Sequence, residues 1–271
     1  MRAATLRSLD LFSGIGGFAL GFERAGIDTV MFCEIEPFPR RVLAERFPGR
    51  PIHDDVRTLS ADAVLRATGP VDVICGGFPC QDVSESNVNG AGIDGQRSGL
   101  WSEMHRLIRD LRPKFAVVEN VSNLLVRGLG RVLGDLAGIG YDAEWRGIRA
   151  CDVGAPHIRA RTWIIAYPSA SERRSLDSAR GRVARRNPVL QGQEIADGFA
   201  RFPAQAWHEP WTETHARLSR LDDGLPCGVA GFNAYANAVV PQIAEMIGCA
   251  ILSVESSMAD NSSGSDVPVM P

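Results

Sequence analysis

A thiol, a carboxyl group and two guanidinium groups stand at positions in this sequence where side chains meet substrates. Cys80 ends a Cys-Gly-Gly-Phe-Pro-Cys segment that follows the apolar run 71–74. This order predicts a buried strand that ends in a tight turn. Open α/β sheets bind ligands outside the carboxyl ends of their strands, so we expect Cys80 to be reactive rather than a half-buried structural cysteine.

Glu119 and a pair of arginines are candidate partners of this thiol. Glu119 ends the apolar run 115–119, and burial at a strand end raises the pKa of a carboxyl group, so that it can donate a proton near neutral pH. Arg159 and Arg161 flank a single residue, which places both on one side of an extended chain. They could bind an anionic or carbonyl group or pair with acids, and Glu119 could equally cap a helix or pair with an arginine.

A glycine-rich segment, residues 12–17, follows the first predicted strand and opens the first predicted helix. Glycines let the backbone approach a ligand, and the helix N-terminus offers free N–H groups. The segment fits the dinucleotide-binding pattern, with Glu34 near the expected distance. Glu34 could bind a ribose, and Asp54 and Asp55 an adenine amino group, although all three also suit turns or caps. An NAD-dependent oxidoreductase would explain the glycines but not Cys80.

The spacing of apolar residues predicts the elements that position these groups. Short apolar runs alternate with helical patterns over residues 1–167, which predicts an α/β domain built from βαβ units. The predicted strands are 6–12, 29–32, 71–75, 115–119 and 163–166, and the predicted helices are 17–25, 101–111 and 241–252.

The rest of the chain changes character. Residues 168–229 lose hydrophobic periodicity and are rich in Arg, Pro, Gly and Ser, which predicts a small irregular lobe. Residues 230–252 regain helical periodicity and return to the first domain. Residues 253–271 are rich in Ser, Asp and Asn, so we expect a disordered tail.

Composition limits the class of protein. The chain has 271 residues, a net charge of −3 and 45% hydrophobic residues, which is typical of a soluble globular protein. No stretch suits a membrane span or a signal peptide, and the six cysteines lack CxxC spacing, so we expect a reducing cytoplasm and no metal site. Residues 145–190 hold ten arginines against three acids, which suits either a phosphate-binding face or a solvated loop.

Six segments, in the correct order, resemble the C5-cytosine-specific DNA methyltransferases of bacterial or phage type. These segments are Phe12–Gly17, Gly77–Gln81, Arg97–Trp101, Glu119–Val121, Arg159–Arg161 and Ala236–Pro241. The resemblance runs through nearly all of residues 6–250. It implies a Rossmann-like S-adenosylmethionine-dependent methyltransferase sheet with helices on both faces, plus a small irregular target-recognition lobe at 168–229. His157 and Ala236 depart from the family pattern, which commonly has Gln and Gly there.

The resemblance implies S-adenosylmethionine as the methyl donor and no metal. Phe12 would stack on the adenine, Glu34 would bind the ribose and Asp55 the adenine amine. The implied cofactor-binding residues are Phe12, Ser13, Gly14, Ile15, Gly16, Gly17, Glu34, Ile35, Asp55, Val56, Pro79, Leu100, Asn237, Ala238 and Val239.

The resemblance also implies a covalent mechanism on a cytosine flipped out of the duplex. Cys80 would attack C6, Glu119 would bond N3 and the exocyclic amine, and Arg161 would hold O2 with support from Arg159. The implied catalytic residues are Cys80, Glu119, Arg161, Arg159, Pro79, Gln81 and Asn120.

Double-stranded DNA is the partner that the resemblance implies, in restriction–modification or as an orphan methyltransferase. The short lobe leaves open a cognate restriction endonuclease or a helper specificity chain as a second partner. We expect a cytoplasmic protein, of bacterial or phage origin, associated with the nucleoid through DNA. Two alternatives remain at this point: a tRNA cytosine-5 methyltransferase, and an inactive cofactor-binding module with a DNA-binding or regulatory role.

Overall fold

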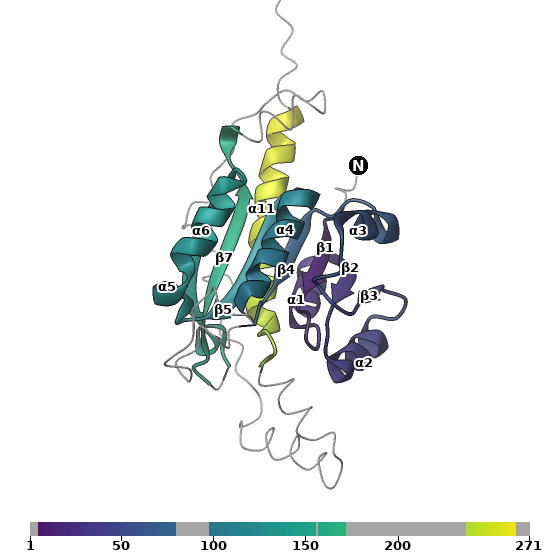
Figure 1. Cartoon of the computed structure of the whole chain (residues 1–271). Helices are drawn as coiled ribbons and strands as arrows, with labels where there is room; N and C mark the ends of the chain where they lie inside the picture. The colour runs from purple at the N-terminus through teal and green to yellow at the C-terminus, as the bar shows by residue number, and fades with distance from the viewer. Residues whose placement is uncertain (1–4, 80–97, 156, 172–236, 264–271) are drawn as a thin grey trace, which may run out of the picture.

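The computed structural model describes residues 5–79, 98–155, 157–171 and 237–263. They build a seven-stranded sheet in the order β3-β2-β1-β4-β5-β7-β6 (Figure 1). Neighbours from β3 to β5 run parallel, whereas β7 is antiparallel to both β5 and β6. The strands are β1 (Arg7–Leu11), β2 (Asp28–Cys33), β3 (Ile52–His53), β4 (Val73–Gly76), β5 (Phe115–Val121), β6 (Tyr141–Arg149) and β7 (Ala160–Pro168).

Helices cover both faces of the sheet. One hydrophobic cluster joins one face to α4 and α6, and a second joins the other face to α1 and α11 (Figure 1). This arrangement confirms the predicted α/β class. The helices are α1 (Gly17–Ala25), α2 (Pro37–Arg46), α3 (Ala61–Thr68), α4 (Trp101–Leu111), α5 (Leu124–Arg127), α6 (Leu129–Gly138) and α11 (Pro241–Ser263), with short 3-10 turns η2 (Ser98–Leu100) and η3 (Ala150–Val153).

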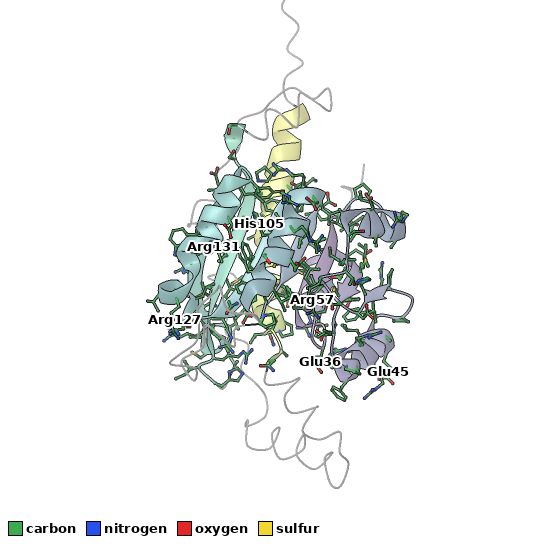
Figure 2. The ribbon with its side chains drawn as sticks, viewed as in Figure 1. Glu36, Glu45, Arg57, His105, Arg127 and Arg131 are labelled. Carbon is green, nitrogen blue, oxygen red and sulfur yellow. The ribbon has the colours of Figure 1, made fainter. Side chains whose placement is uncertain are left out.

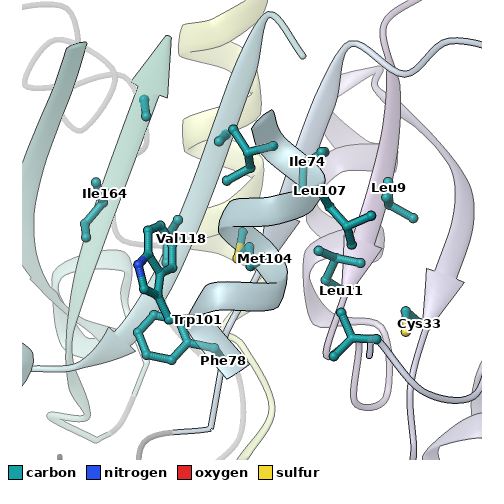
Figure 3. Packing of buried hydrophobic residues seen from close by; sticks show 14 of the residues in the cluster. Leu9, Leu11, Cys33, Ile74, Phe78, Trp101, Met104, Leu107, Val118 and Ile164 are labelled. Carbon is teal, nitrogen blue, oxygen red and sulfur yellow. The ribbon is translucent and has the colours of Figure 1, made fainter. Parts of the chain in front are cut away.

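The larger cluster lies between the sheet and α4. Trp101, Met104 and Leu107 from α4 are fully or almost fully buried against Val118 of β5 and Phe78 of the turn after β4 (Figure 3). The rings of Trp101 and Phe78 are 5.7 Å apart. Full burial of such side chains contributes roughly 1.5–3 kcal/mol each. The turn that leads to Cys80 is therefore held against the core by its own phenylalanine.

The predicted helices 17–25 and 101–111 have the observed bounds of α1 and α4. Gly26 ends α1: its φ is 99°, and its N–H donates to the carbonyls of Phe22 and Glu23. The sequence analysis missed β6, because this strand at the end of the sheet order has no continuous apolar run. Trp145 and Arg146 in its middle are exposed.

The expected disorder from residue 253 onward is wrong for residues 253–263, because α11 continues to Ser263. Two interactions hold the first residues of this extension. Val254 is buried in the cluster beneath α11, and the Lys114 ammonium bonds Glu255 at 2.8 Å while it also lies 3.4 Å from Asp72. Although α11 is 23 residues long, no helix in the described ranges is long and apolar enough to cross a membrane.

Two glycines let α1 approach the C-terminal segment. A Cβ atom at Gly17 would lie 2.5 Å from the carbonyl oxygen of Val239, and one at Gly21 would lie 2.6 Å from the Cβ of Ala244. Real Cβ contacts are never this short. The absence of side chains at these positions therefore brings the residues before α11 against the start of α1.

We expect Gly21→Ala to lower the free energy of unfolding by about 1–3 kcal/mol, because the added methyl group overpacks the α1–α11 contact. Urea denaturation measures this change. Gly134→Ala in α6 is the matched control, because a Cβ there meets nothing within 4 Å. It should stabilise the protein by about 1 kcal/mol through helix propensity. Equal effects of the two variants would contradict the close approach.

Candidate active site

The candidate site lies where β1, β4 and β5 end side by side. These strands are parallel neighbours, so the chain segments that follow them meet at one edge of the sheet. The segments are the glycine-rich residues 12–17, the turn 77–79 and the end of β5 around Glu119. The predicted residues Cys80 and Gln81 lie outside the described residues, directly after Pro79.

Glu119 lies against the turn that leads to Cys80. Its side chain is only 8% exposed, and its Oε2 atom would be 2.8 Å from a Cβ atom at Gly77. Only a glycine allows the carboxyl group this close to the backbone. The structure therefore places the predicted proton donor against Gly77, which precedes the predicted nucleophile Cys80 by three residues in the sequence.

Arg161 pairs with Glu119. The Nε atom of Arg161 lies 3.0 Å from Oε1 of Glu119, an interaction across the antiparallel strands β5 and β7. Burial raises the pKa of Glu119, while the charges of Arg161 and Arg159 act in the opposite direction. Glu119 therefore does pair with an arginine, which was one of the two alternatives from the sequence. The pair lies at the predicted site.

Asn120 joins the end of β5 to the same turn. Its Nδ2 donates to the carbonyl of Phe78 at 3.0 Å, and its Oδ1 accepts from the N–H of Val121 at 2.8 Å. Asn120 is buried, whereas Pro79 is partly buried. Both polar ends of the amide are thus satisfied, which fixes the position of the residues before Cys80.

The glycine-rich segment has the backbone of a ligand-binding turn. Phe12, Gly14 and Gly16 have φ angles of 54°, 53° and 85°. A left-handed phenylalanine is uncommon and costs on the order of 1 kcal/mol, so the surrounding structure must hold it. Ser13 does so: its hydroxyl donates to the carbonyl of Asp10 at 2.7 Å, and its N–H donates to the carbonyl of Cys33 at 3.1 Å.

Glu34 closes this turn from the end of β2. Its Oε2 accepts from the N–H of Gly14 at 2.7 Å, and its Oε1 accepts from the N–H of Glu36 at 2.8 Å. Burial raises the pKa of Glu34, and these two backbone hydrogen bonds oppose the shift. Each carboxyl oxygen retains a lone pair, so the group can still accept from a pair of hydroxyls.

Asp55 follows β3 and is bound by its neighbour Arg57, which Figure 2 labels. The Arg57 Nε lies 2.9 Å from Oδ1 and its Nη2 lies 2.7 Å from Oδ2. Hydrogen bonds from Arg57 lower the pKa of Asp55. Val56 is buried beside it, whereas Ile35 is 55% exposed.

The remaining predicted cofactor residues lie around the same turn or on elements that pack nearby. Ile15 is partly buried within the turn. Leu100 precedes α4 and packs on the same cluster as Phe12. Val239 lies against Gly17, with Asn237 and Ala238 immediately before it. The structure thus gathers the N-terminal turn and the C-terminal segment, which are more than 200 residues apart in the sequence.

Asp10 is a group that the sequence analysis did not single out. It is fully buried in β1, and neither carboxyl oxygen has a hydrogen-bond partner among the described residues. Burial raises the pKa of Asp10 well above its usual value; the nearby Cys75 thiol and the Ala19 amide offset only part of this cost, and the charge of Glu34 adds to it. The only sequence signal was an acid between two leucines of the first strand.

No cluster of three or more metal-ligating side chains occurs within the described ranges. The departure at His157 lies beside the site, and burial and then the charge of Arg159 lower its pKa, so that it is uncharged near neutral pH. Ala236 lies outside the described residues.

Asp10 predicts a pH dependence of stability. The folded state holds the proton at a higher pH than the unfolded chain does, so the free energy of unfolding should fall as pH rises between the two pKa values. The slope is about 1.4 kcal/mol per pH unit for one proton. We expect Asp10→Asn to remove this slope and to stabilise the protein at pH 7, measured by urea denaturation at pH 5 and pH 7.

Asp110→Asn, in the exposed last turn of α4, is the control and should leave the slope unchanged. If the free energy of unfolding changes with pH equally in the wild type and in Asp10→Asn, then Asp10 has the same pKa in the folded and the unfolded chain, and the prediction is wrong.

Comparisons with known proteins agree with this geometry. Residues 6–220 match the family described as C-5 cytosine-specific DNA methylase. The type II methyltransferase M2.BsuMI of Bacillus subtilis (strain 168) is 35% identical over 169 residues, which cover 59% of this chain and 42% of that protein. The type II methyltransferase M1.HphI of Haemophilus parahaemolyticus is 35% identical over 176 residues, 62% of this chain and 47% of that protein.

One solved structure has the same fold over most of the chain. It is an E. coli protein described as a DNA modification methyltransferase encoded within a prophage, with a TM-score of 0.63, 20% identity and coverage of 93% of this chain and all of that chain. The matched part of this chain spans less than half the length of the two curated relatives. The family match extends over more than half of the sequence. The chain therefore belongs to the C-5 cytosine-specific DNA methylases.

Proposed function

We propose that this protein transfers the methyl group of S-adenosylmethionine to C5 of cytosine in double-stranded DNA. The observation that carries the proposal is a buried carboxyl group, Glu119, held by Arg161 against the turn that leads to Cys80. C5 of cytosine is a weak nucleophile until another group adds at C6. A thiol and a proton donor on one edge of the sheet are what such an addition needs.

The residues of the glycine-rich turn fit the methyl donor. The Glu34 carboxyl group is held by two backbone amides and can accept from the ribose hydroxyls, and Asp55 can accept from the adenine amine. Phe12, Ile35 and Leu100 offer apolar surface for the adenine ring. When bound, S-adenosylmethionine supplies an electrophilic methyl group on a sulfonium.

Cys80 is the proposed nucleophile. A thiolate is required, and the described cysteines inside the sheet are unsuited to that role: burial raises the pKa of Cys33 to about 12, and burial raises that of Cys75 well above its usual value. Cys80 instead directly follows Pro79 in the sequence, at the end of the turn that Glu119 contacts. Its sulfur would form a bond to C6 of a cytosine flipped out of the helix.

Glu119 would protonate N3 as the thiolate adds, so that the electron pair displaced toward N3 is neutralised. The raised pKa of Glu119 keeps the proton available, and Arg161 and Arg159 restrain the carboxyl group and can hold the O2 oxygen. C5 then takes the methyl group as an enamine carbon. A base removes the C5 proton, the C6–S bond breaks to release the Cys80 thiolate, and N3 returns its proton to Glu119.

The family and the type II relatives favour DNA over tRNA as the substrate. The proposed lobe, residues 168–229, begins at the end of β7 and lies outside the described residues from residue 172 onward. A cognate restriction endonuclease or a helper specificity chain would be a second partner in a restriction–modification role. The proposed place of action is the cytoplasm, at the nucleoid.

Duplex DNA that contains 5-fluorocytosine tests the covalent step, because fluorine at C5 blocks the final elimination. With S-adenosylmethionine, the purified protein should form a denaturant-resistant adduct that is visible on a denaturing gel. Cys80→Ala should abolish the adduct and leave binding of S-adenosylmethionine within about 2-fold, because the thiol is not needed for cofactor affinity.

Cys151→Ala is the matched control, because Cys151 is an exposed cysteine outside the site, and it should leave the adduct intact. An adduct that persists in Cys80→Ala would contradict the nucleophile assignment. Absence of any adduct in the wild type, with cofactor bound, would favour an inactive binding module.

Glu119→Gln tests the proton donor. Glutamine keeps the size of the side chain but carries no acidic proton, so single-turnover methyl transfer should fall by about 10²–10⁴-fold. The wild-type rate should also fall as pH rises through the pKa of Glu119, because the acid form is required, and the variant should lack this alkaline limb.

The control is Glu144→Gln on β6, where the carboxyl group accepts from the Tyr167 hydroxyl. It should keep both the rate and the alkaline limb. An unchanged rate in Glu119→Gln would remove Glu119 from the mechanism.

A further inference from the structure

The segment between β3 and α3, residues 55–59, carries two residues of the proposed cofactor site, Asp55 and Val56. Local hydrogen bonds give it a turn: the N–H groups of Thr58 and Leu59 both donate to the carbonyl of Asp55, at 3.0 and 3.2 Å. The carboxylate of Asp55 is bound within the turn by Arg57. These contacts shape the turn, and the Thr58 hydroxyl also lies 2.8 Å from Nε2 of His53 in β3.

Arg106 of α4 bonds the backbone of the turn to a helix distant in the sequence. Its Nη2 donates to the carbonyl of Val56 at 3.1 Å and to the carbonyl of Leu59 at 2.9 Å, across about 50 residues of sequence. Its Nε donates to Glu103 at 2.8 Å, which orients the guanidinium. One planar group thus holds two carbonyls that lie on either side of the turn.

The helix that carries Arg106 is itself fixed. Trp101, Met104 and Leu107 are buried in the main cluster, which also contains Val56 and Leu59. The side chains of the turn are therefore packed beneath α4, and its carbonyls are bonded by the same helix. Arg106 is only partly exposed, so water competes with these bonds less than at an open surface.

We infer that Arg106 is a positioning residue for the methyl donor, which holds residues 55–59 in the shape that accepts the adenine. This inference rests on the proposed function. Arg106 touches neither the Asp55 carboxylate nor the reacting atoms; it acts through the Val56 and Leu59 carbonyls. Its loss should weaken cofactor binding and leave the methyl-transfer step nearly unchanged.

The chemistry of the side chain makes the inference specific. A guanidinium can donate to Glu103 with Nε and to two carbonyls with Nη2 at the same time. A lysine ammonium is a single point donor and cannot reproduce this planar arrangement. Arg109, one turn further along α4, bonds its neighbour Asp110 and lies on the exposed side, which makes it a matched control.

The experiment uses the full chain and S-adenosylmethionine, with dissociation constants from calorimetry and rates under saturating cofactor. Arg106→Ala should raise the dissociation constant by about 10- to 100-fold, the range expected when hydrogen bonds to a charged group are lost. The rate at saturation should stay within about 3-fold of the wild type. Arg106→Lys should recover less than half of the affinity loss on a logarithmic scale, and Arg109→Ala should bind as the wild type does.

Two further measurements separate positioning from general destabilisation. Addition of methylguanidinium should restore cofactor affinity in Arg106→Ala, because it can refill the space between Glu103 and the two carbonyls. Hydrogen exchange of the amides of residues 58 and 59 should accelerate in Arg106→Ala and not in Arg109→Ala. If Arg106→Ala does not fold, Arg106→Lys carries the same comparisons.

Equal cofactor affinity in the Arg106 and Arg109 variants would overturn the inference, as would a loss that appears in the rate at saturation and not in affinity. A wild-type protein that fails to bind S-adenosylmethionine would instead overturn the proposed function. The two failures are therefore distinguishable.

Discussion

A carboxyl group taken out of water at the end of β5 is the constraint on which the site depends. A buried charge without a partner costs free energy, so a buried Glu119 needs either a proton or a cation. Burial raises its pKa and so favours the protonated form, and Arg161 provides the cation. The antiparallel β7 is what brings that cation to the carboxyl edge, because Arg161 stands opposite Val121. A wholly parallel sheet would place the start of this strand at the far edge.

Two further buried acids, Glu34 and Asp10, lie near the same edge. Glu34 fixes the glycine-rich turn through the amides of Gly14 and Glu36, and Asp10 lies below it without a hydrogen-bond partner in the described structure. Burial of Asp10 without such a partner costs stability, and a fold selected for stability alone would have an apolar residue there.

The parts of the fold that could be read from the sequence are those set by local pattern. The bounds of α1 and α4 follow from apolar spacing and from Gly26, and residues such as Glu119 and Arg161 stand out because they interrupt or flank apolar runs. Non-local contacts could not be read. Arg106 bonds carbonyls about 50 residues away, Asn120 bonds the turn at Phe78, and Lys114 pairs with Glu255 of α11. No periodicity encodes these pairings.

The direction of β7 also limits the segment that follows it. Arg161 lies near the start of β7, at the edge of the sheet where the candidate site lies, and Pro168 ends the strand opposite Tyr141 at the other edge. The helix α11 begins beside Gly17 and Gly21, at the same edge as the candidate site. At about 3.3 Å per residue, a nine-residue strand spans roughly 30 Å. The described residues on either side of 172–236 therefore lie toward opposite edges of the sheet, so any segment that joins them needs enough residues to cover this distance.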